Sequence, residues 1–148
     1  MSDAPHAPHA PIPFHLAFPV KDLASTRAFY GGLLGCREAR SSDDSVELDF
    51  FGHQIVAHVA ADEAAHNALL HRMGDDDVPP RHFGAVLPWE EWPRWVTRLR
   101  LAGVKFLIEP HVEDKGPGGE QATFFFADPS GNVLELKSFR DPGRMFAR

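Results

Sequence analysis

The sequence predicts an α+β fold made of two β-α-β-β-β modules. Three observations carry this prediction. Strand-like and helix-like patterns follow one another in the same order in the two halves of the chain, which indicates an internal repeat. A histidine stands at the start of the first strand-like run of each half, at His15 and at His82. A glycine turn precedes the last strand of each half, at Gly52 and at Gly131.

Length and composition are those of one globular domain. The chain has 148 residues, 43% of them hydrophobic and 24% charged. A formal net charge of −6 argues against nucleic acids or anionic membranes as partners. No apolar run approaches the roughly 20 residues of a membrane-spanning helix, and no secretory signal is visible. Cys36 is the single cysteine, so no intrachain disulfide can form, and we expect a cytoplasmic protein.

The folded part is predicted to span residues 13–140 as a single domain, after a disordered proline-rich leader over residues 1–12. Module 1 covers residues 13–60. Its helix is expected to begin after Asp22, a good N-cap residue, and to end at Gly35. Alternating or β-branched runs predict the strands of this module at residues 14–20, 37–40, 46–50 and 54–59.

Residues 61–80 are predicted to be a linker with a short helix over 61–73. Module 2 covers residues 81–140, with a helix around Trp92 that Gly103 closes, and residues 141–148 form a tail. The glycine-rich stretch 116–119 is expected to form a lid or rim over a pocket. The strands of this module are predicted at residues 82–87, 104–108, 121–126 and 133–139.

The last strand carries a carboxylate that needs a partner. Asp128-Pro-Ser-Gly is a turn, and the residues after it alternate so that Glu135 lies opposite the apolar face of Leu134 and Leu136. Burying such a charge without a counter-charge or a metal costs several kcal/mol. Two imidazoles and one carboxylate are a known ligand set for a mononuclear metal ion. His15, His82 and Glu135 are therefore candidate metal ligands.

The paired modules resemble the vicinal oxygen chelate superfamily over residues 13–140. The resemblance is carried by Ala28-Phe29-Tyr30 with the following Leu34-Gly35, and by Asp128-Pro-x-Gly with Glu135. It implies a cupped mixed β-sheet with a metal in the cup. In that superfamily the ligands come from the first strand of each module and the last strand of the second, which implies the same three residues.

Within that superfamily the ligand set is most like that of the extradiol dioxygenases. This implies a non-haem Fe(II) enzyme that opens a small catechol-like substrate with O₂, with Fe(II) favoured and Mn(II), Ni(II) or Zn(II) as alternatives. His58 is the predicted acid/base residue, although an ordinary histidine bonded to the backbone explains it as well. Phe124, Phe125 and Phe126 occupy the strand on which these enzymes carry a pocket tyrosine.

Three alternatives stay open. A glyoxalase I-like isomerase would need a fourth ligand where the repeat places Val56. A fosfomycin-type thiol transferase would use the same ligands with a basic pocket, whereas the lysines here are scattered along the chain. A metal-free binding module like the bleomycin-binding proteins would not need the ligand set. In every case we expect a small-molecule ligand and a homodimer, with Trp89 or Trp95 at the subunit interface.

Overall fold

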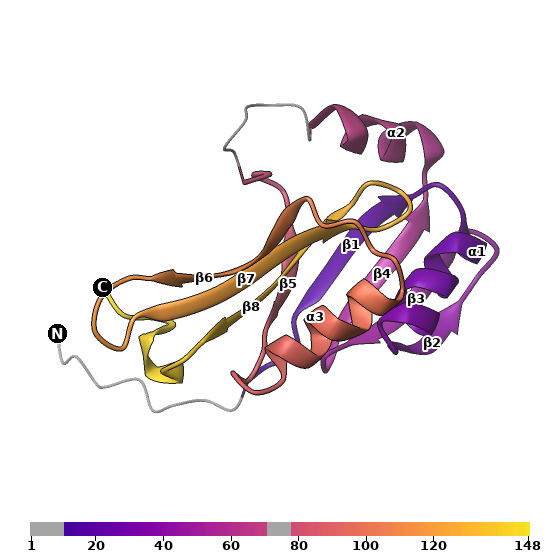
Figure 1. The fold of residues 1–148 in the computed structure, drawn as a ribbon. Coiled ribbons are helices and arrows are strands. Elements are labelled where there is room, and N and C mark those ends of the chain that lie inside the picture. The colour runs from indigo at the N-terminus through magenta and orange to yellow at the C-terminus, as the bar shows by residue number, and fades with distance from the viewer. Residues whose placement is uncertain (1–10, 71–77) are drawn as a thin grey trace, which may run out of the picture.

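The computed structural model describes residues 11–70 and 78–148 (Figure 1). The predicted leader lies outside the described residues except for its last two positions, and residues 71–77 of the predicted linker also lie outside them. The α+β fold of two repeated modules is confirmed, and each module forms its own four-stranded mixed sheet. Within the described residues, no helix is long and apolar enough to cross a membrane.

Module 1 forms a sheet of strand order β1-β4-β3-β2. Strand β1 pairs in parallel with β4, and the other pairs are antiparallel. The Asp22 side chain caps α1 by accepting a hydrogen bond from the Ser25 amide at 2.7 Å. The elements are β1 (His15–Val20), α1 (Leu23–Thr26) continued by the π-helix η1 (Arg27–Leu33), β2 (Arg37–Ser41), β3 (Ser45–Phe50) and β4 (His53–Val59).

Module 2 repeats this order in a sheet of strand order β5-β8-β7-β6. Strand β5 pairs in parallel with β8, and the remaining pairs are antiparallel. Helix α2 (Ala61–Leu70) follows module 1, and the 3-10 helix η2 (Pro142–Arg144) follows module 2. The elements between them are β5 (Phe83–Val86), α3 (Trp92–Leu101), β6 (Ile108–Asp114), β7 (Glu120–Ala127) and β8 (Val133–Phe139).

One predicted strand is misplaced. Residues 104–107 are not a strand, because Val104 and Phe106 pack against the core while pairing with β7 begins only at Ile108. Strand β6 instead continues to Asp114 and forms a long hairpin with β7. The glycine-rich stretch closes that hairpin, with the Gly119 amide donating to the Gly116 carbonyl at 2.7 Å. This stretch is therefore a hairpin tip.

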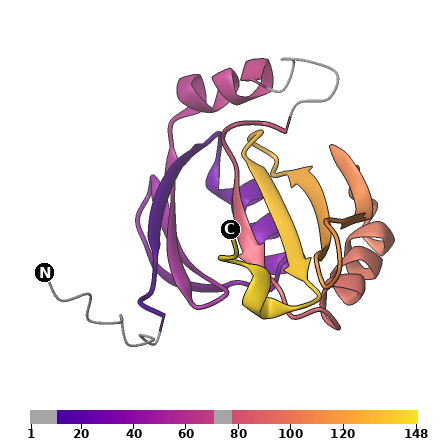
Figure 2. The same cartoon turned by 90° about the vertical axis from the view of Figure 1, so that its left-hand side faces the viewer.

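Each sheet has one buried face and one open face. Alternation along a strand sends neighbouring side chains to opposite faces. The buried faces contribute Phe18 and Val20 from β1 and Leu134 and Leu136 from β8 to a single hydrophobic core. Helix α3 packs on the buried face of module 2, where the Trp92 indole donates to the Leu136 carbonyl at 3.0 Å. Figure 2 shows the two sheets on either side of the molecule, with α2 at one end.

Candidate metal centre

His82 and Glu135 lie together on the open face of module 2. The Nε2 atom of His82 is 3.3 Å from Oε1 of Glu135, and the two side chains are 27% and 14% exposed, respectively. The pairing of β5 with β8 sets this distance, because it places Gly84 beside Glu135. A Cβ atom on Gly84 would stand 1.6 Å from the Glu135 carbonyl oxygen. The absence of a side chain at position 84 is therefore what allows the two strands to meet here.

The remaining polar atoms of this pair have their own partners. His82 Nδ1 is 2.7 Å from the Pro79 carbonyl, and since a carbonyl only accepts, Nδ1 carries a proton and donates. Thr123 donates to Oε2 of Glu135 at 2.5 Å. In the neutral imidazole this leaves a lone pair on Nε2 facing a carboxylate oxygen. Two acceptors at this distance repel each other unless a proton or a cation lies between them.

His15 is held in the same tautomer on the open face of module 1. Its Nδ1 atom is 2.7 Å from Oε1 of Gln54, the residue beside it on β4. The amide nitrogen of Gln54 points to Glu47 Oε2 at 3.5 Å, which directs the Gln54 oxygen toward the imidazole. Nδ1 of His15 is thus the donor, and Nε2 is left free at an exposed position.

The structure does not bring all three predicted ligands together within one chain. Among residues 11–70 and 78–148, no group of three or more His, Cys, Asp or Glu side chains lies close enough to share an ion. The reason is the packing of the modules. The rings of Phe18 and Phe83 meet at 5.3 Å in the shared core. His15 is three residues before Phe18, and His82 directly precedes Phe83. An odd separation along an extended chain sends side chains to opposite faces, so both imidazoles point away from that contact.

His58 does not lie beside either half of the predicted centre. It is exposed on β4, where it pairs with Pro19 and Ser45. It shares a face with Gln54 but stands four residues further along, roughly 13 Å at the usual strand rise. The acid/base role of His58 stays a prediction.

The surroundings of Glu135 include residues that sequence reasoning did not connect to it. The Phe125 ring packs edge-on against His82 with centroids 5.0 Å apart, whereas Phe124 and Phe126 lie in the core. Lys137 lies beside Thr123 on the open face, with its ammonium 5.2 Å from the Phe139 ring. Lys137 is two residues from Glu135 on β8, so strand alternation puts both side chains on one face, whereas the hydrogen bond from Thr123 depends on the register between β7 and β8.

Comparisons with known proteins agree with this architecture. Residues 12–136 match the family model described as Glyoxalase/Bleomycin resistance protein/Dioxygenase superfamily. A crystal structure of a glyoxalase/bleomycin resistance protein/dioxygenase from Alicyclobacillus acidocaldarius is 33% identical, with a TM-score of 0.73 over 91% of this chain and 96% of that chain.

Two further relatives are more distant. The virulence protein STM3117 from Salmonella typhimurium is 26% identical over 84% of this chain and 82% of its own length. The fosfomycin resistance protein FosX from Listeria monocytogenes, in a structure with Mn(II) and sulfate, is 20% identical. Its TM-score is 0.61 over 84% of this chain and 86% of that chain. At 20% identity this comparison shows only that the two chains share a fold.

Proposed function

Because the chain belongs to the glyoxalase/bleomycin resistance protein/dioxygenase superfamily, we propose that it is a metal-dependent enzyme acting on a small, anionic, oxygen-chelating substrate. The observation that best supports this proposal is the 3.3 Å separation of His82 Nε2 and Glu135 Oε1. The other polar atoms of the pair, Nδ1 and Oε2, already have hydrogen-bond partners. Two atoms at that separation suit adjacent ligands of one ion, given ligand bonds of about 2.1 Å. The donor set fits a divalent cation.

We propose that His15 of a second chain completes the ligand set. Its imidazole is exposed, lies on an edge strand and has its free nitrogen on the open face of module 1. A homodimer that sets this face against the open face of module 2 in the partner would supply the third ligand. By symmetry such a dimer has two equivalent centres.

The residues around the centre define what the substrate must offer. Thr123 donates a hydrogen bond to Oε2 of Glu135, which leaves Oε1, the oxygen beside His82, for the ion. Lys137 lies one pleat further along β8 on the same face, with its ammonium over the Phe139 ring, and we propose that it binds a negative group of the substrate. Phe125 supplies an apolar wall beside His82. A divalent ion bound here would polarise the chelated oxygens as a Lewis acid.

For the reaction itself we favour addition of a nucleophile to the bound substrate, as in the fosfomycin-type alternative. Support comes from Lys137 on the face of Glu135 and from the Mn(II)-bound FosX structure, which has the same fold. The extradiol-type dioxygenase is the second candidate, because two histidines and one carboxylate are also the ligands of non-haem Fe(II) oxygenases. The position of His58, well along β4 from Gln54, gives that reaction less support.

Metal titration tests the proposal. Metal-depleted protein is titrated with Mn(II) and, anaerobically, with Fe(II), and binding is followed by calorimetry. We expect saturable binding that Glu135→Gln weakens at least tenfold, while Glu120→Gln, a carboxylate paired with Arg140 on the sheet margin, leaves it unchanged. Equal binding by both variants, or none by the parent protein, would favour a metal-free binding module.

Oxygen uptake separates the two reactions. The Fe(II)-loaded protein is offered a panel of catechols, and the Mn(II)-loaded protein is offered small phosphonate epoxides with a thiol or water as nucleophile. Turnover without oxygen consumption supports nucleophile addition. Oxygen consumption that depends on a catechol selects the dioxygenase.

A further inference from the structure

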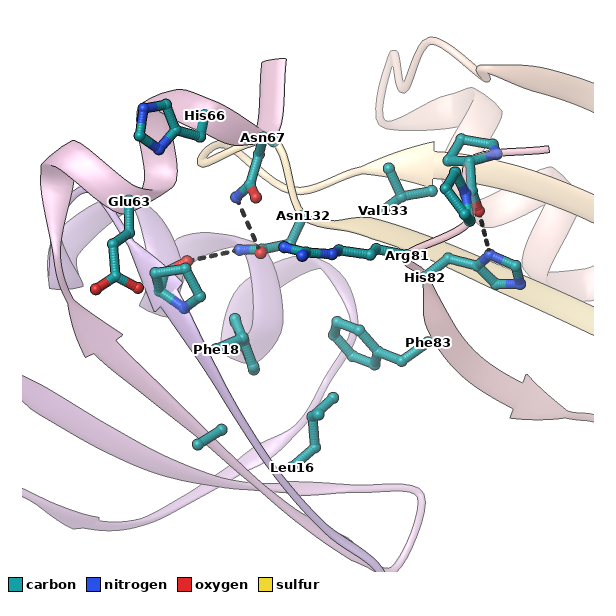
Figure 3. Close-up of a pocket in the computed structure, with 15 residues that line it drawn as sticks. Leu16, Phe18, Glu63, His66, Asn67, Arg81, His82, Phe83, Asn132 and Val133 are labelled. Carbon is teal, nitrogen blue, oxygen red and sulfur yellow. Dashed lines mark hydrogen bonds between the residues drawn. The ribbon is translucent and has the colours of Figure 1, made fainter. Parts of the chain in front are cut away.

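A cavity of about 500 Å³ lies between the two modules, and Glu135 is not among the residues that line it (Figure 3). It is bounded by β1, by α2, by residues 79–83 and by the turn before β8. That volume is in the range of small-molecule sites. The floor is apolar and consists of Leu16, Phe18 and Phe83. Although His82 also borders the cavity, its imidazole points away from the cavity centre toward the Pro79 carbonyl.

Hydrogen-bond acceptors gather on one wall of this cavity. Glu63 and Asn67 both line it from α2, four residues apart and so on one face of the helix. The two amide hydrogens of Asn67 are committed, one to the Ser130 carbonyl and one to Asn132 Oδ1, each at 3.1 Å. Its own oxygen is left as an acceptor. A carboxylate and an amide oxygen one helical turn apart suit an ammonium group.

A guanidinium enters from the opposite side. The Arg81 side chain extends across the cavity toward Asn132, as Figure 3 shows, while Glu63 and His66 lie on the α2 side. A guanidinium recognises a carboxylate through two parallel N–H donors. The Asn132 side chain beside Arg81 is held in place, since it donates to the Pro19 carbonyl and to Asp128, both at 2.9 Å.

We propose that this cavity binds a free α-amino acid with an apolar side chain. Arg81 binds the carboxylate, Glu63 and the Asn67 oxygen bind the ammonium group, and the apolar side chain rests on Leu16, Phe18 and Phe83. Glu63 and Arg81 are both exposed at the cavity, so water can solvate each charge when the cavity is empty. A zwitterion is the ligand that can form a charge-assisted hydrogen bond with both groups at once. This inference does not rest on the metal centre.

Binding of three matched probes tests the proposal on the full-length protein. L-phenylalanine, 3-phenylpropionate (which lacks the ammonium group) and 2-phenylethylamine (which lacks the carboxylate) are compared by ligand-observed NMR and calorimetry. We expect saturable binding of L-phenylalanine and at least tenfold weaker binding of each analogue. No saturable binding of L-phenylalanine at millimolar concentration, or equal binding of the three probes, would overturn the proposal.

Variants identify the two ends of the site. Glu63→Gln is expected to abolish the preference for L-phenylalanine over 3-phenylpropionate, and Arg81→Gln the preference over 2-phenylethylamine. Arg94→Gln, on α3 and outside the cavity, is the matched control and should keep both preferences. Circular dichroism confirms that each variant is folded. Unchanged preferences in both cavity variants would contradict the assignment even if the amino acid binds.

Discussion

The Tyr30 hydroxyl donates a 2.8 Å hydrogen bond to Oδ2 of Asp128, and this bond joins module 1 to module 2 inside the core. Asp128 also accepts from the Ser130 and Asn132 amides through Oδ1. In the sequence, Ala28-Phe29-Tyr30 and Asp128-Pro-Ser-Gly are separate features of the two modules. In the structure they form one contact, which fixes how the modules sit against each other.

Removing this hydroxyl should destabilise the protein measurably. Tyr30→Phe keeps the ring packed against Phe18 and Phe29 but removes one donor from a buried carboxylate. We expect the free energy of unfolding to fall by about 1–3 kcal/mol. Urea denaturation measures it, with Thr97→Val on the exposed surface of α3 as a hydroxyl-removing control of less than about 0.5 kcal/mol. Equal effects of the two substitutions would contradict the role given to Tyr30.

The cost of Tyr30→Phe should depend on pH. Burial raises the pKa of Asp128, while hydrogen bonds from Asn132 and Tyr30 lower it in part. Since the folded pKa lies above the unfolded one, this group's contribution to stability is greatest in acid and falls as the pH rises through the folded pKa. Burial, and then the Asp128 charge, raise the pKa of Tyr30 well above its usual value, so the hydroxyl keeps its proton at neutral pH.

Loss of the Tyr30 donor moves the folded pKa of Asp128 further upward. The destabilisation by Tyr30→Phe is therefore expected to be larger at pH 7, where Asp128 has to ionise, than at pH 4. Urea denaturation of both proteins at the two pH values measures the difference, in which the other titrating groups cancel. A cost that is the same or larger at pH 4 would show that the bond does not support the ionised carboxylate.

Gly84 should tolerate no side chain. An alanine Cβ would overlap the backbone of Glu135 at 1.6 Å and force β5 away from β8. We expect Gly84→Ala to lower the free energy of unfolding by about 3 kcal/mol or more, or to prevent folding. Gly32→Ala is the control, because nothing lies within 4 Å of the added methyl group there, and its effect should stay within about 1 kcal/mol. Thermal unfolding that ranks the two variants the other way would refute this strand contact.

Thr123 should act on metal affinity through Glu135. Thr123→Val preserves shape but leaves Glu135 Oε2 without its donor. We expect metal affinity to fall about 10- to 100-fold with little change in stability. Calorimetric titration with Mn(II) compares this variant with Thr97→Val, which should bind as the parent does. An unchanged affinity in Thr123→Val would mean that Glu135 does not need this orientation to bind the ion.

Much of the fold could be predicted because local chemistry dictates it. The Asp128 turn and the alternation after it placed Leu134 and Leu136 in the core and Glu135 on the open face, as observed. The strand predicted at 104–108 was wrong because short apolar runs in a loop and in a strand look alike until the register with β7 is known. Gly31 and Gly32 have low helix propensity, and the structure has a π-helix over this part of the predicted helix.

The candidate site could be predicted only in part. The repeat indicated which strands carry His15, His82 and Glu135, and the structure pairs the last two. The sequence does not predict whether the open face of module 1 meets module 2 of the same chain or module 2 of a partner chain. The repeat is the same in both arrangements. The contacts of Thr123 with Glu135 and of the Pro79 carbonyl with His82 could not be predicted either, because they depend on strand register and on the path of a loop.

The central claim, a metal centre shared between two chains, is tested most directly with mixed dimers. His15→Ala and Glu135→Gln each break both centres of a homodimer. A dimer of one chain of each kind keeps one intact centre if His15 acts on the partner, and none if it acts within its own chain. The two variants are co-expressed with different tags, the mixed dimer is isolated, and its Mn(II) content is measured by calorimetric titration. We predict one tight site per mixed dimer, with parent affinity. Binding no stronger than in the two variant homodimers, or a protein that stays monomeric at the concentrations used, would contradict the shared centre.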